Sequence, residues 1–381
     1  MKKKVLFITG TRADYGKLKS LMKEVELSDS FELFVFVTGM HMLSKYGSTW
    51  QEIKKDNFKN IHQYINQTGQ GQMDITLSNT ILGLSNYVHE LQPDMIVIHG
   101  DRLEALAGAI VGGFNNIRVI HIEGGEISGT IDESIRHAIT KFSHIHLVSN
   151  QEAKRRVIQL GEKEDTIFII GSPDIDIMLS EDLPDLNEVK QRYELPFDSY
   201  AILIYHPVTT ELEQLEHNIK QVVEAVVQSN HNYVVIYPNN DEGNQKILDM
   251  YQQFEENPKI KLYPSMRFEY FLTLLKNSRF LIGNSSTGIR ETGIYGIPSI
   301  DIGNRQNGRY DATKQGGSII SVKENSEDIL HAIASINGRQ NRQVDYGEGN
   351  SHKQFIKLLE SDTIWSVSIQ KKFIDASSNE V

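Results

Sequence analysis

Short apolar runs recur along the whole chain and alternate with longer amphipathic stretches. The runs are rich in β-branched residues, which is typical of buried parallel strands. Between them, stretches such as 212–228 and 268–277 have the period of amphipathic helices. This alternation predicts an α/β protein built on doubly wound parallel sheets. The expected strands are Val5–Thr9, Leu33–Thr38, Met95–His99, Arg118–Ile122, Ile145–Val148, Ile167–Ile170, Ala201–Tyr205, Tyr233–Tyr237, Ile260–Leu262, Phe280–Ile282, Ser299–Ile302 and Ser318–Val322.

The expected strands divide into two sets, which predicts two domains. A chain of 381 residues suits two domains of about 150–200 residues each. A proline-bearing stretch, 171–196, separates the sets and is the expected linker. We therefore expect an N-terminal domain over 1–172 and a C-terminal domain over 173–361. The tail, 362–381, is expected to be helical and to pack back on the first domain.

Three acidic residues stand where a ligand is expected. Asp101 and Glu123 each follow closely on an expected strand, and Asp132 opens the next helix. Ligands of open α/β sheets bind beyond the carboxyl ends of the strands, so we expect these acids to converge on one cleft. Carboxylates grouped in this way indicate acid–base chemistry on a small polar substrate. For Asp132 the alternative is a first-turn acid that complements the helix dipole.

Two glycine-containing turns are candidates for phosphate binding. In the turn after the first strand, Gly10 precedes Arg12, whose guanidinium can bind two phosphate oxygens. The glycine spacing does not fit a P-loop, and an ordinary strand–helix turn is the alternative. The stronger candidate is 283–291, where Ser285 and Ser286 suit a diphosphate and Glu291 suits ribose hydroxyls. Helix capping explains one of these serines at most.

Histidines are frequent, yet the pattern does not predict a metal site. His121 and Glu123 share one strand face, as do His144 and His146. Zinc sites need three or four convergent ligands, and nothing beyond spacing suggests one, so we expect no metal. His206 ends a strand of the second set and is expected to donate a hydrogen bond to a phosphate or leaving group.

Composition narrows the function further. The net charge of −11 argues against nonspecific binding to nucleic acid. No apolar run is long enough to span a bilayer, and the N-terminus does not have the pattern of a signal peptide. With no cysteine, thiolate nucleophiles and cysteine-bound zinc are excluded. We expect a cytoplasmic enzyme that does not act at a membrane.

Several motifs together resemble the hydrolysing UDP-N-acetylglucosamine 2-epimerases of sialic acid biosynthesis. The resemblance extends from residue 1 to about residue 310 with the motifs in the family's order. It implies a fold like that of GT-B glycosyltransferases: two Rossmann-like domains with the active site in the cleft between them. The motifs are GTRADYGKL, TGMHM, HGDRLEALAGA, HIEGGEISGTIDESIRHAITK, GSPDID, HPVTT, YPNND, GNSSTGIRE and GNRQNGR.

The resemblance also implies a reaction and the residues for it. UDP is eliminated from UDP-N-acetylglucosamine to give 2-acetamidoglucal, and water then adds to form N-acetylmannosamine, with no cofactor. Asp101, Glu123, Asp132 and His206 match the family's catalytic residues. The matching UDP contacts are Arg12, His41, Arg102, Asn239, Ser285, Ser286, Gly288, Glu291 and Arg305. A homodimer is expected.

Other readings remain open on the sequence. A related hydrolysing 2-epimerase could act on another sugar nucleotide, such as UDP-N,N'-diacetylbacillosamine on the legionaminic acid route. The difference between these substrates lies in one pocket contact. The remaining alternatives are a non-hydrolysing epimerase, a GT-B transferase and a non-catalytic nucleotide-sugar binding protein. Retention of all three acids disfavours the non-catalytic protein.

Overall fold

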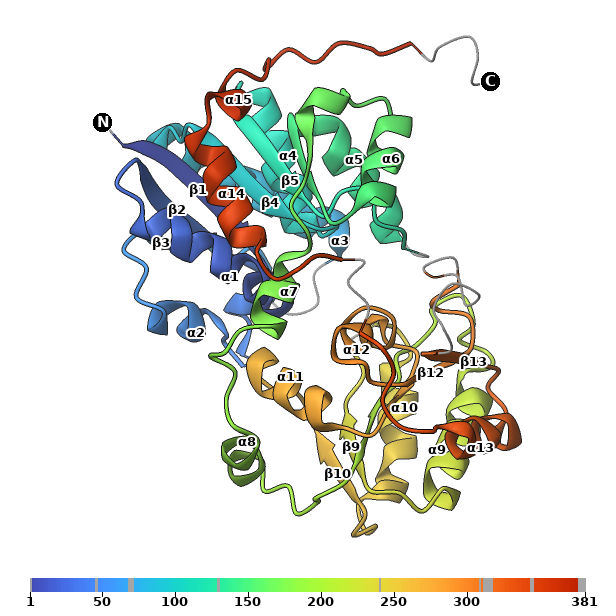
Figure 1. The fold of residues 1–381 in the computed structure, drawn as a ribbon. Coiled ribbons are helices and arrows are strands. Elements are labelled where there is room, and N and C mark those ends of the chain that lie inside the picture. Colours follow the sequence, from blue (N-terminus) through green and yellow to red (C-terminus); the bar gives the residue numbers. More distant parts are fainter. Residues whose placement is uncertain are drawn as a thin grey trace. The chain divides into compact units, whose positions relative to one another are not determined.

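The chain folds into two compact units in the computed structural model (Figure 1). The first unit is Met1–Leu179 with Asp345–Val381, and the second is Ser180–Val344. The structure describes residues 2–44, 47–67, 72–128, 131–239, 241–307, 310, 318–342 and 346–375.

The first unit is built on a seven-stranded sheet of order β3-β2-β1-β4-β5-β6-β7, in which every pair is parallel. The order reverses direction between β1 and β4, which is the position where open α/β sheets bind ligands. Its elements are β1 (Lys3–Thr9), α1 (Arg12–Leu27), β2 (Phe31–Val37), η1 (Gly39–Met42), α2 (Trp50–Lys55), β3 (Ile61–Gln63), α3 (Met73–Leu91), β4 (Met95–His99), α4 (Leu103–Phe114), β5 (Arg118–Ile122), α5 (Ile131–Phe142), β6 (Ile145–Val148), α6 (Gln151–Gln159), η3 (Glu164–Thr166), β7 (Ile167–Ile169), α7 (Pro173–Met178), α14 (Ser351–Glu360) and α15 (Asp362–Trp365).

Helices cover both faces of this sheet because alternate strand residues point to opposite sides. Val5 and Phe7 of β1 belong to a core cluster with side chains of α1 and α14. Leu6 and Ile8 of the same strand belong to a second cluster with α3, α4 and α5. Figure 1 shows α1 and α14 on the near side of the strands. Burial of both faces explains why the strands read as nearly continuous apolar runs.

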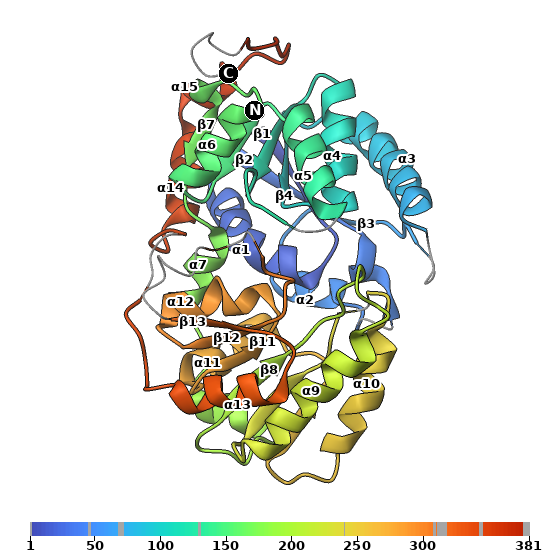
Figure 2. The same cartoon turned by 90° about the vertical axis from the view of Figure 1, so that its right-hand side faces the viewer.

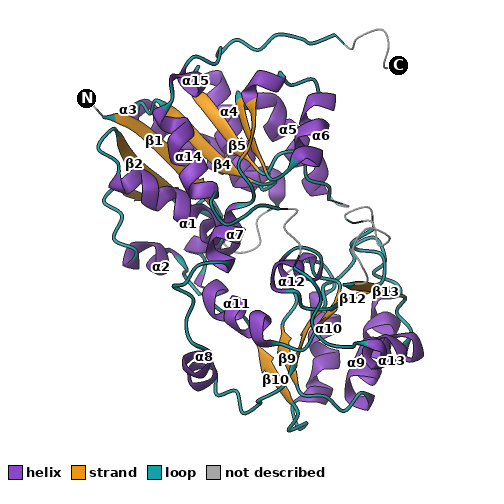
Figure 3. Cartoon of the chain, viewed as in Figure 1, coloured by secondary structure: helices purple, strands orange, loops and turns teal. Residues whose placement is uncertain are grey.

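The second unit repeats the arrangement with a six-stranded parallel sheet of order β10-β9-β8-β11-β12-β13 (Figure 3). Helices α9, α10 and α13 pack on one face of it. The elements of this unit are α8 (Leu186–Arg192), β8 (Ala201–Ile204), α9 (Leu215–Gln228), β9 (Tyr233–Ile236), α10 (Asn244–Tyr251), η4 (Gln252–Phe254), β10 (Ile260–Tyr263), α11 (Phe268–Asn277), β11 (Leu281–Gly283), η5 (Ser286–Gly288), α12 (Glu291–Tyr295), β12 (Ser299–Ile302), β13 (Ile319–Val322) and α13 (Ser326–Ser335).

All twelve strands predicted from the sequence are present, most of them within a residue or two of the expected bounds. One strand, β3, was not predicted. It lies at the edge of its sheet, and its three residues are not fully buried, so it lacks the apolar run that marks the others. The predicted linker contains two helices, α7 and α8.

The division between the units differs from the expected one. The sequence placed the boundary after residue 172, whereas the first unit continues through α7 to Leu179. The chain returns to the first unit at Asp345 rather than at residue 362, so α14 belongs to that unit. Phe355 and Leu359 of α14 are buried in the first core, which the amphipathic pattern of the helix could not assign to either sheet.

The predicted helical tail is wrong for most of its described length. Among the described residues after α14 only Asp362–Trp365 is helical, and residues 366–375 form no helix. The tail does pack on the first unit: Ile364 of α15 is buried in the first core, and Lys371 Nζ donates to the Ser143 carbonyl at 2.6 Å and pairs with Glu162. Within the described residues, none of the helices combines the length and the hydropathy that a membrane span requires.

Candidate active site

Glu123 is a buried acid of the first unit, with 4% of its surface exposed. It directly follows β5 with a φ of +62°, a backbone region that non-glycine residues rarely adopt. Its carboxylate lies 3.3 Å from Lys17 Nζ of α1 and 3.0 Å from His99 Nε2 at the end of β4. The Ser172 hydroxyl donates a hydrogen bond to the same carboxylate. Glu123 is therefore held among groups that can give or take protons.

Asp101 lies beyond the end of β4 and pairs with Arg136 of α5. Arg136 is itself held by the Ser128 hydroxyl at 2.6 Å. The backbone just before Asp101 is supported by His121, whose Nε2 lies 2.8 Å from the Gly100 carbonyl. A carbonyl only accepts, so this nitrogen carries a proton. Burial lowers the pKa of His121 to about 3 in agreement with that role.

Asp132 lies in the first turn of α5, as the sequence predicted. Together with Glu104 and Asp14, it raises the pKa of Arg102, the residue that caps α4, although burial acts in the opposite direction. Asp101 acts on Arg102 in the same sense. Asp101 and Asp132 thus share the electrostatic environment of one guanidinium, and Arg102 stays cationic beside them.

The turn after β1 is occupied by a carboxylate of the chain itself. Asp14 accepts hydrogen bonds at 2.9 Å from the backbone N–H groups of both Gly10 and Thr11, and forms a capping box with Thr11. These are the N–H groups that a phosphate would need. The Arg12 side chain extends away and lies 2.8 Å from Glu52 of α2. The turn can therefore offer a phosphate the Arg12 guanidinium but not these two N–H groups.

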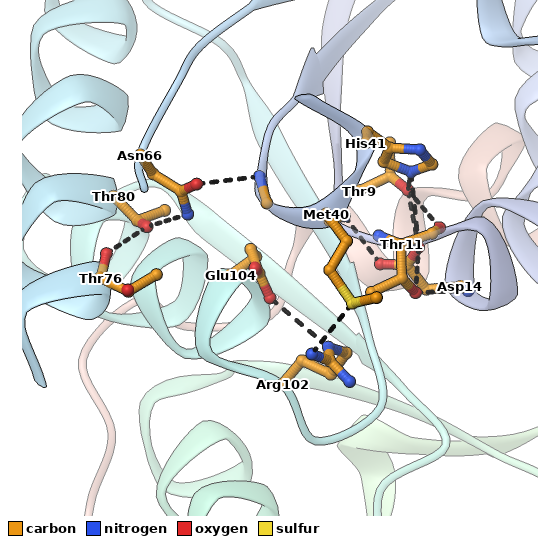
Figure 4. Close-up of polar contacts among 12 residues, drawn as sticks. Thr9, Thr11, Asp14, Met40, His41, Asn66, Thr76, Thr80, Arg102 and Glu104 are labelled. Atoms are coloured by element: carbon orange, nitrogen blue, oxygen red, sulfur yellow. Dashed lines mark hydrogen bonds and ion pairs between the residues drawn. The ribbon is translucent and has the colours of Figure 1, made fainter. Parts of the chain in front are cut away.

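His41 is packed inside the fold and is not presented to a ligand. The ring is fully buried, with Nε2 3.0 Å from the Thr9 hydroxyl and Nδ1 2.6 Å from the Thr49 hydroxyl. Figure 4 shows it beside Thr9, Thr11 and Asp14. Burial lowers its pKa to about 4. Both nitrogens are used, so this geometry gives His41 a structural role in place of the UDP contact implied by resemblance.

In the second unit, His206 follows β8 and is set by two asparagines. Its Nδ1 accepts a hydrogen bond at 3.0 Å from the Asn239 backbone N–H, which places the ring proton on Nε2. Asn284, after β11, bonds both the His206 N–H and the His206 carbonyl through its side chain. Burial, aided by Arg305, lowers the pKa of His206 to about 3. His206 is thus a neutral donor at Nε2, suited to a hydrogen bond with an oxyanion.

The expected diphosphate loop, residues 283–291, contains the N-terminal cap of the short helix η5. Ser285 accepts from the Thr287 backbone N–H at 3.4 Å, so it has the capping role that the sequence left as the alternative, and Ser286 is partly exposed. A Cβ on Gly288 would lie 2.5 Å from Ser299 Oγ, so Gly288 serves close packing. Glu291 starts α12 and is largely buried. Arg305 donates to the Asn284 carbonyl at 3.1 Å, which joins it to the His206 group.

His144 and His146, which share one strand face and for which a metal site was considered but not expected, have other partners. His144 Nδ1 accepts from the Val119 backbone N–H at 3.1 Å, and His146 Nε2 lies 3.2 Å from Glu162. Across the described ranges, no three His, Cys, Asp or Glu residues are grouped as a metal ion would require.

Four residues of these groups were not selected from the sequence: Lys17, His99 and Ser172 around Glu123, and Asn284 beside His206. Lys17 and Asn284 stand in the same sequence motifs as Arg12 and Ser285, which were selected from the sequence. Asn284 stands in a glycine-containing turn after a strand and Lys17 in the helix α1 that follows such a turn, and these positions were the available signal. Ser172 stands in the motif GSPDID, but the motif did not indicate that the path of the chain after β7 brings this serine to Glu123.

Comparison with known proteins finds close relatives over nearly the whole chain. A family model described as UDP-N-acetylglucosamine 2-epimerase matches residues 23–360. A UDP-N-acetylglucosamine 2-epimerase of Neisseria meningitidis is 46% identical over 98% of this chain and 99% of its own. A hydrolysing UDP-N,N'-diacetylbacillosamine 2-epimerase of Legionella pneumophila is 32% identical (97% and 99%), and the polysialic acid biosynthesis protein P7 of Escherichia coli is 33% identical (99% and 96%). The crystal structure of a Neisseria meningitidis UDP-GlcNAc 2-epimerase bound to UDP-GlcNAc has the same fold, with a TM-score of 0.80 at 19% identity and coverage of 93% and 99%.

Proposed function

Because this chain belongs to the UDP-N-acetylglucosamine 2-epimerase family, we propose that it is a hydrolysing UDP-N-acetylglucosamine 2-epimerase. It converts UDP-N-acetylglucosamine and water to N-acetylmannosamine and UDP. This is the first step of sialic acid biosynthesis, a route that the likeness to the polysialic acid biosynthesis protein supports.

The reaction runs in two stages. The C2 proton and UDP leave from opposite faces of the sugar, which forms the C1–C2 double bond of 2-acetamidoglucal. Water then supplies hydroxide to C1 and a proton to C2, with inverted configuration at C2. A carboxylate must take the first proton, and a second group must deliver the other and activate water.

The arrangement around Glu123 is the observation that carries the proposal. A buried carboxylate within 3.3 Å of an ammonium and 3.0 Å of an imidazole has proton donors and acceptors at hand. Asp101 follows β4, and Asp132 lies in the first turn of α5, which follows β5. Both therefore stand at the carboxyl ends of the strands of the first sheet. We assign the proton transfers to these three acids.

The diphosphate of UDP requires hydrogen-bond donors rather than acids, because its negative charge grows as UDP leaves, whereas Glu291 is assigned to the ribose hydroxyls. His206 offers a neutral Nε2–H, and Arg305 stands close enough to lower its pKa. Arg12, Arg102, Asn239, Ser286 and Glu291 complete the proposed set. Ser285 and Gly288 support it through capping and packing.

Product analysis tests the function. Purified protein is incubated with UDP-N-acetylglucosamine in deuterated water and followed by proton NMR. We expect free N-acetylmannosamine that carries deuterium at C2. UDP-N-acetylmannosamine as the product would show a non-hydrolysing enzyme, and product with the original C2 hydrogen would exclude elimination.

A second candidate substrate is UDP-N,N'-diacetylbacillosamine. The 32% identical Legionella relative named for that substrate is the observation in its favour. The 46% identity to the UDP-N-acetylglucosamine enzyme favours the first candidate. Ratios of kcat/KM for the two sugar nucleotides decide between them.

We further propose that the enzyme is a cytoplasmic homodimer that binds no nucleic acid or membrane. The absence of cysteine fits a reducing compartment such as the cytoplasm.

Helix α3, at the margin of the first unit (Figure 2), has two exposed apolar side chains one heptad apart: Ile75 is 54% exposed and Leu82 is 61% exposed. This surface is suited to a second copy of the chain. Leu82→Glu should reduce the molar mass measured by light scattering from that of a dimer to that of a monomer. A wild-type monomer would refute the proposal.

A further inference from the structure

Glu104 is a buried carboxylate for which the proposed reaction has no role so far. It lies in the first turn of α4 and is only 4% exposed. Within the described part of the chain its Oε2 accepts no hydrogen bond. Burying a carboxyl group in this way costs free energy that an apolar side chain of similar size would avoid. Its presence therefore needs a reason other than packing.

Two loops close directly on this carboxyl group. A Cβ on Gly10, after β1, would lie 2.5 Å from Glu104 Cδ, and a Cβ on Gly39, after β2, would lie 2.4 Å from Glu104 Oε1. The loops are tied on their other sides, because the N–H of Gly10 donates to Asp14 and that of Gly39 donates to Asn66 at 3.1 Å. The Gly10 loop leads within two residues to Arg12.

The same carboxyl group lies beside Arg102. Arg102 Nε lies 3.7 Å from Glu104 Oε2, and Arg102 Nη2 lies 3.9 Å from Met40 Sδ (Figure 4). The Arg102 side chain is 50% exposed, so Glu104 holds it from the buried side while the remainder stays open to a ligand. Burial raises the pKa of Glu104, Arg102 opposes that rise by favouring the ionised form, and Asp14 acts in the same direction as burial.

We propose that Glu104 is a positioning residue that orients Arg102 toward the diphosphate of the sugar nucleotide. This inference rests on the proposed function, because it takes UDP as the ligand of Arg102. Glu104 touches neither the sugar nor UDP. A carboxylate behind a guanidinium restricts its rotamers before the ligand arrives, and that preorganisation improves affinity without a new contact with the ligand.

The test begins with Glu104→Gln, which keeps the shape and removes the charge. Without the charge of Glu104, no ion pair orients Arg102. The dissociation constant of UDP measured by calorimetry should therefore rise about 10-fold. KM for the sugar nucleotide should rise in the same proportion, while kcat changes less than about threefold, because the acids that move protons are untouched. Glu104→Asp keeps the charge and should recover part of the affinity.

The coupling to Arg102 separates positioning from a general effect on stability. In an Arg102→Ala background, Glu104→Gln should weaken UDP binding no further, whereas a merely structural role gives an additive loss. Glu162→Gln is the matched control, since Glu162 is another buried, ion-paired acid of the first unit, away from these loops. It should lower the melting temperature and leave UDP affinity unchanged.

The outcomes distinguish this inference from the proposed function. If wild-type protein binds UDP and Glu104→Gln binds it equally well, the inference fails and the function stands. If wild-type protein binds no UDP, both fail. Should Glu104→Gln not fold, Glu104→Asp replaces it in both backgrounds, and full affinity in that variant contradicts the inference, because it withdraws the carboxyl group by one methylene.

Discussion

At the scale of single residues, each proposed catalytic acid has a cationic group near it. Glu123 has Lys17, and Asp101 has Arg136. Asp132 acts electrostatically on Arg102. Such cationic partners offset the electrostatic repulsion between several acids in one region. They also restrict the movement of each acidic side chain. The side chains are therefore set before a substrate binds, which is what proton transfer at a fixed carbon requires.

Amide substitutions test the acids one at a time. Asp101→Asn, Glu123→Gln and Asp132→Asn should each lower kcat at least about 10²-fold, the usual scale for loss of a general acid or base. UDP affinity should change little, because these acids serve the sugar. Steady-state kinetics and calorimetry give the two quantities.

A matched control lies at the other end of strand β4. Asp94 accepts a hydrogen bond from the Lys4 N–H at 2.7 Å, just before the strand that leads to Asp101. Asp94→Asn should retain near-normal turnover. If Asp132→Asn also did so, Asp132 would return to the helix-dipole role.

At the scale of elements, the second unit depends on a close approach of two strand ends. A Cβ on Gly283, the last residue of β11, would lie 1.9 Å from the Ile204 carbonyl oxygen at the end of β8. Gly283 also has a φ of +136°. This close approach of the strand ends brings Asn284 within hydrogen-bond distance of His206. The position of the candidate phosphate donor His206 therefore depends on the glycine at 283.

Alanine at Gly283 tests that approach. Gly283→Ala should destabilise the protein by roughly 3–5 kcal/mol, since both backbone strain and a clash oppose it. Gly338 is the control: its φ of +99° is also positive, but nothing lies within 4 Å of its Cβ position. Gly338→Ala should cost only about 1–2 kcal/mol, the strain alone. Chemical denaturation of both variants gives the comparison, and equal losses would argue against the clash.

At the scale of the whole molecule, buried neutral histidines make stability depend on pH. Burial lowers the pKa of His41 and His144 to about 4, and of His121 and His206 to about 3, from an ordinary value of 6.5. At a pH between 6.5 and the lowered pKa of each histidine, that histidine takes up a proton in the unfolded chain but not in the folded chain. Their stabilising contribution is therefore complete above pH 6.5 and is lost as the pH falls toward 4 and 3.

The expected result is a lower urea midpoint at pH 5.5 than at pH 7.5. Each such histidine reduces the free energy of unfolding by up to about 1.4 kcal/mol per pH unit inside its window. Glu162, with a pKa lowered to about 2 because its partners outweigh its burial, loses its contribution only below pH 4.5 and does not interfere. His121→Gln should flatten the dependence. A midpoint constant between pH 7.5 and 5.5 would contradict the burial of these rings as neutral groups.

The sequence alone determined the two parallel sheets, because a strand buried on both faces must be apolar throughout and such runs are visible without a structure. It also predicted that Asp101, Glu123 and His206 stand just beyond strand ends, because the residues that follow parallel strands gather at one edge of a sheet. The sequence motifs placed the chain in its family, and the comparisons confirmed that assignment.

Only the tertiary structure decided which partners each acid has and where the chain returns. Lys17 and Ser172 meet at Glu123 although they are far from it in sequence, and α14 packs on the first sheet rather than the second. His41 has a ligand-like motif position yet is buried between two threonines. Local periodicity reports that a face will be buried, but what buries it depends on the path of the whole chain, because packing acts between residues that sequence spacing does not relate.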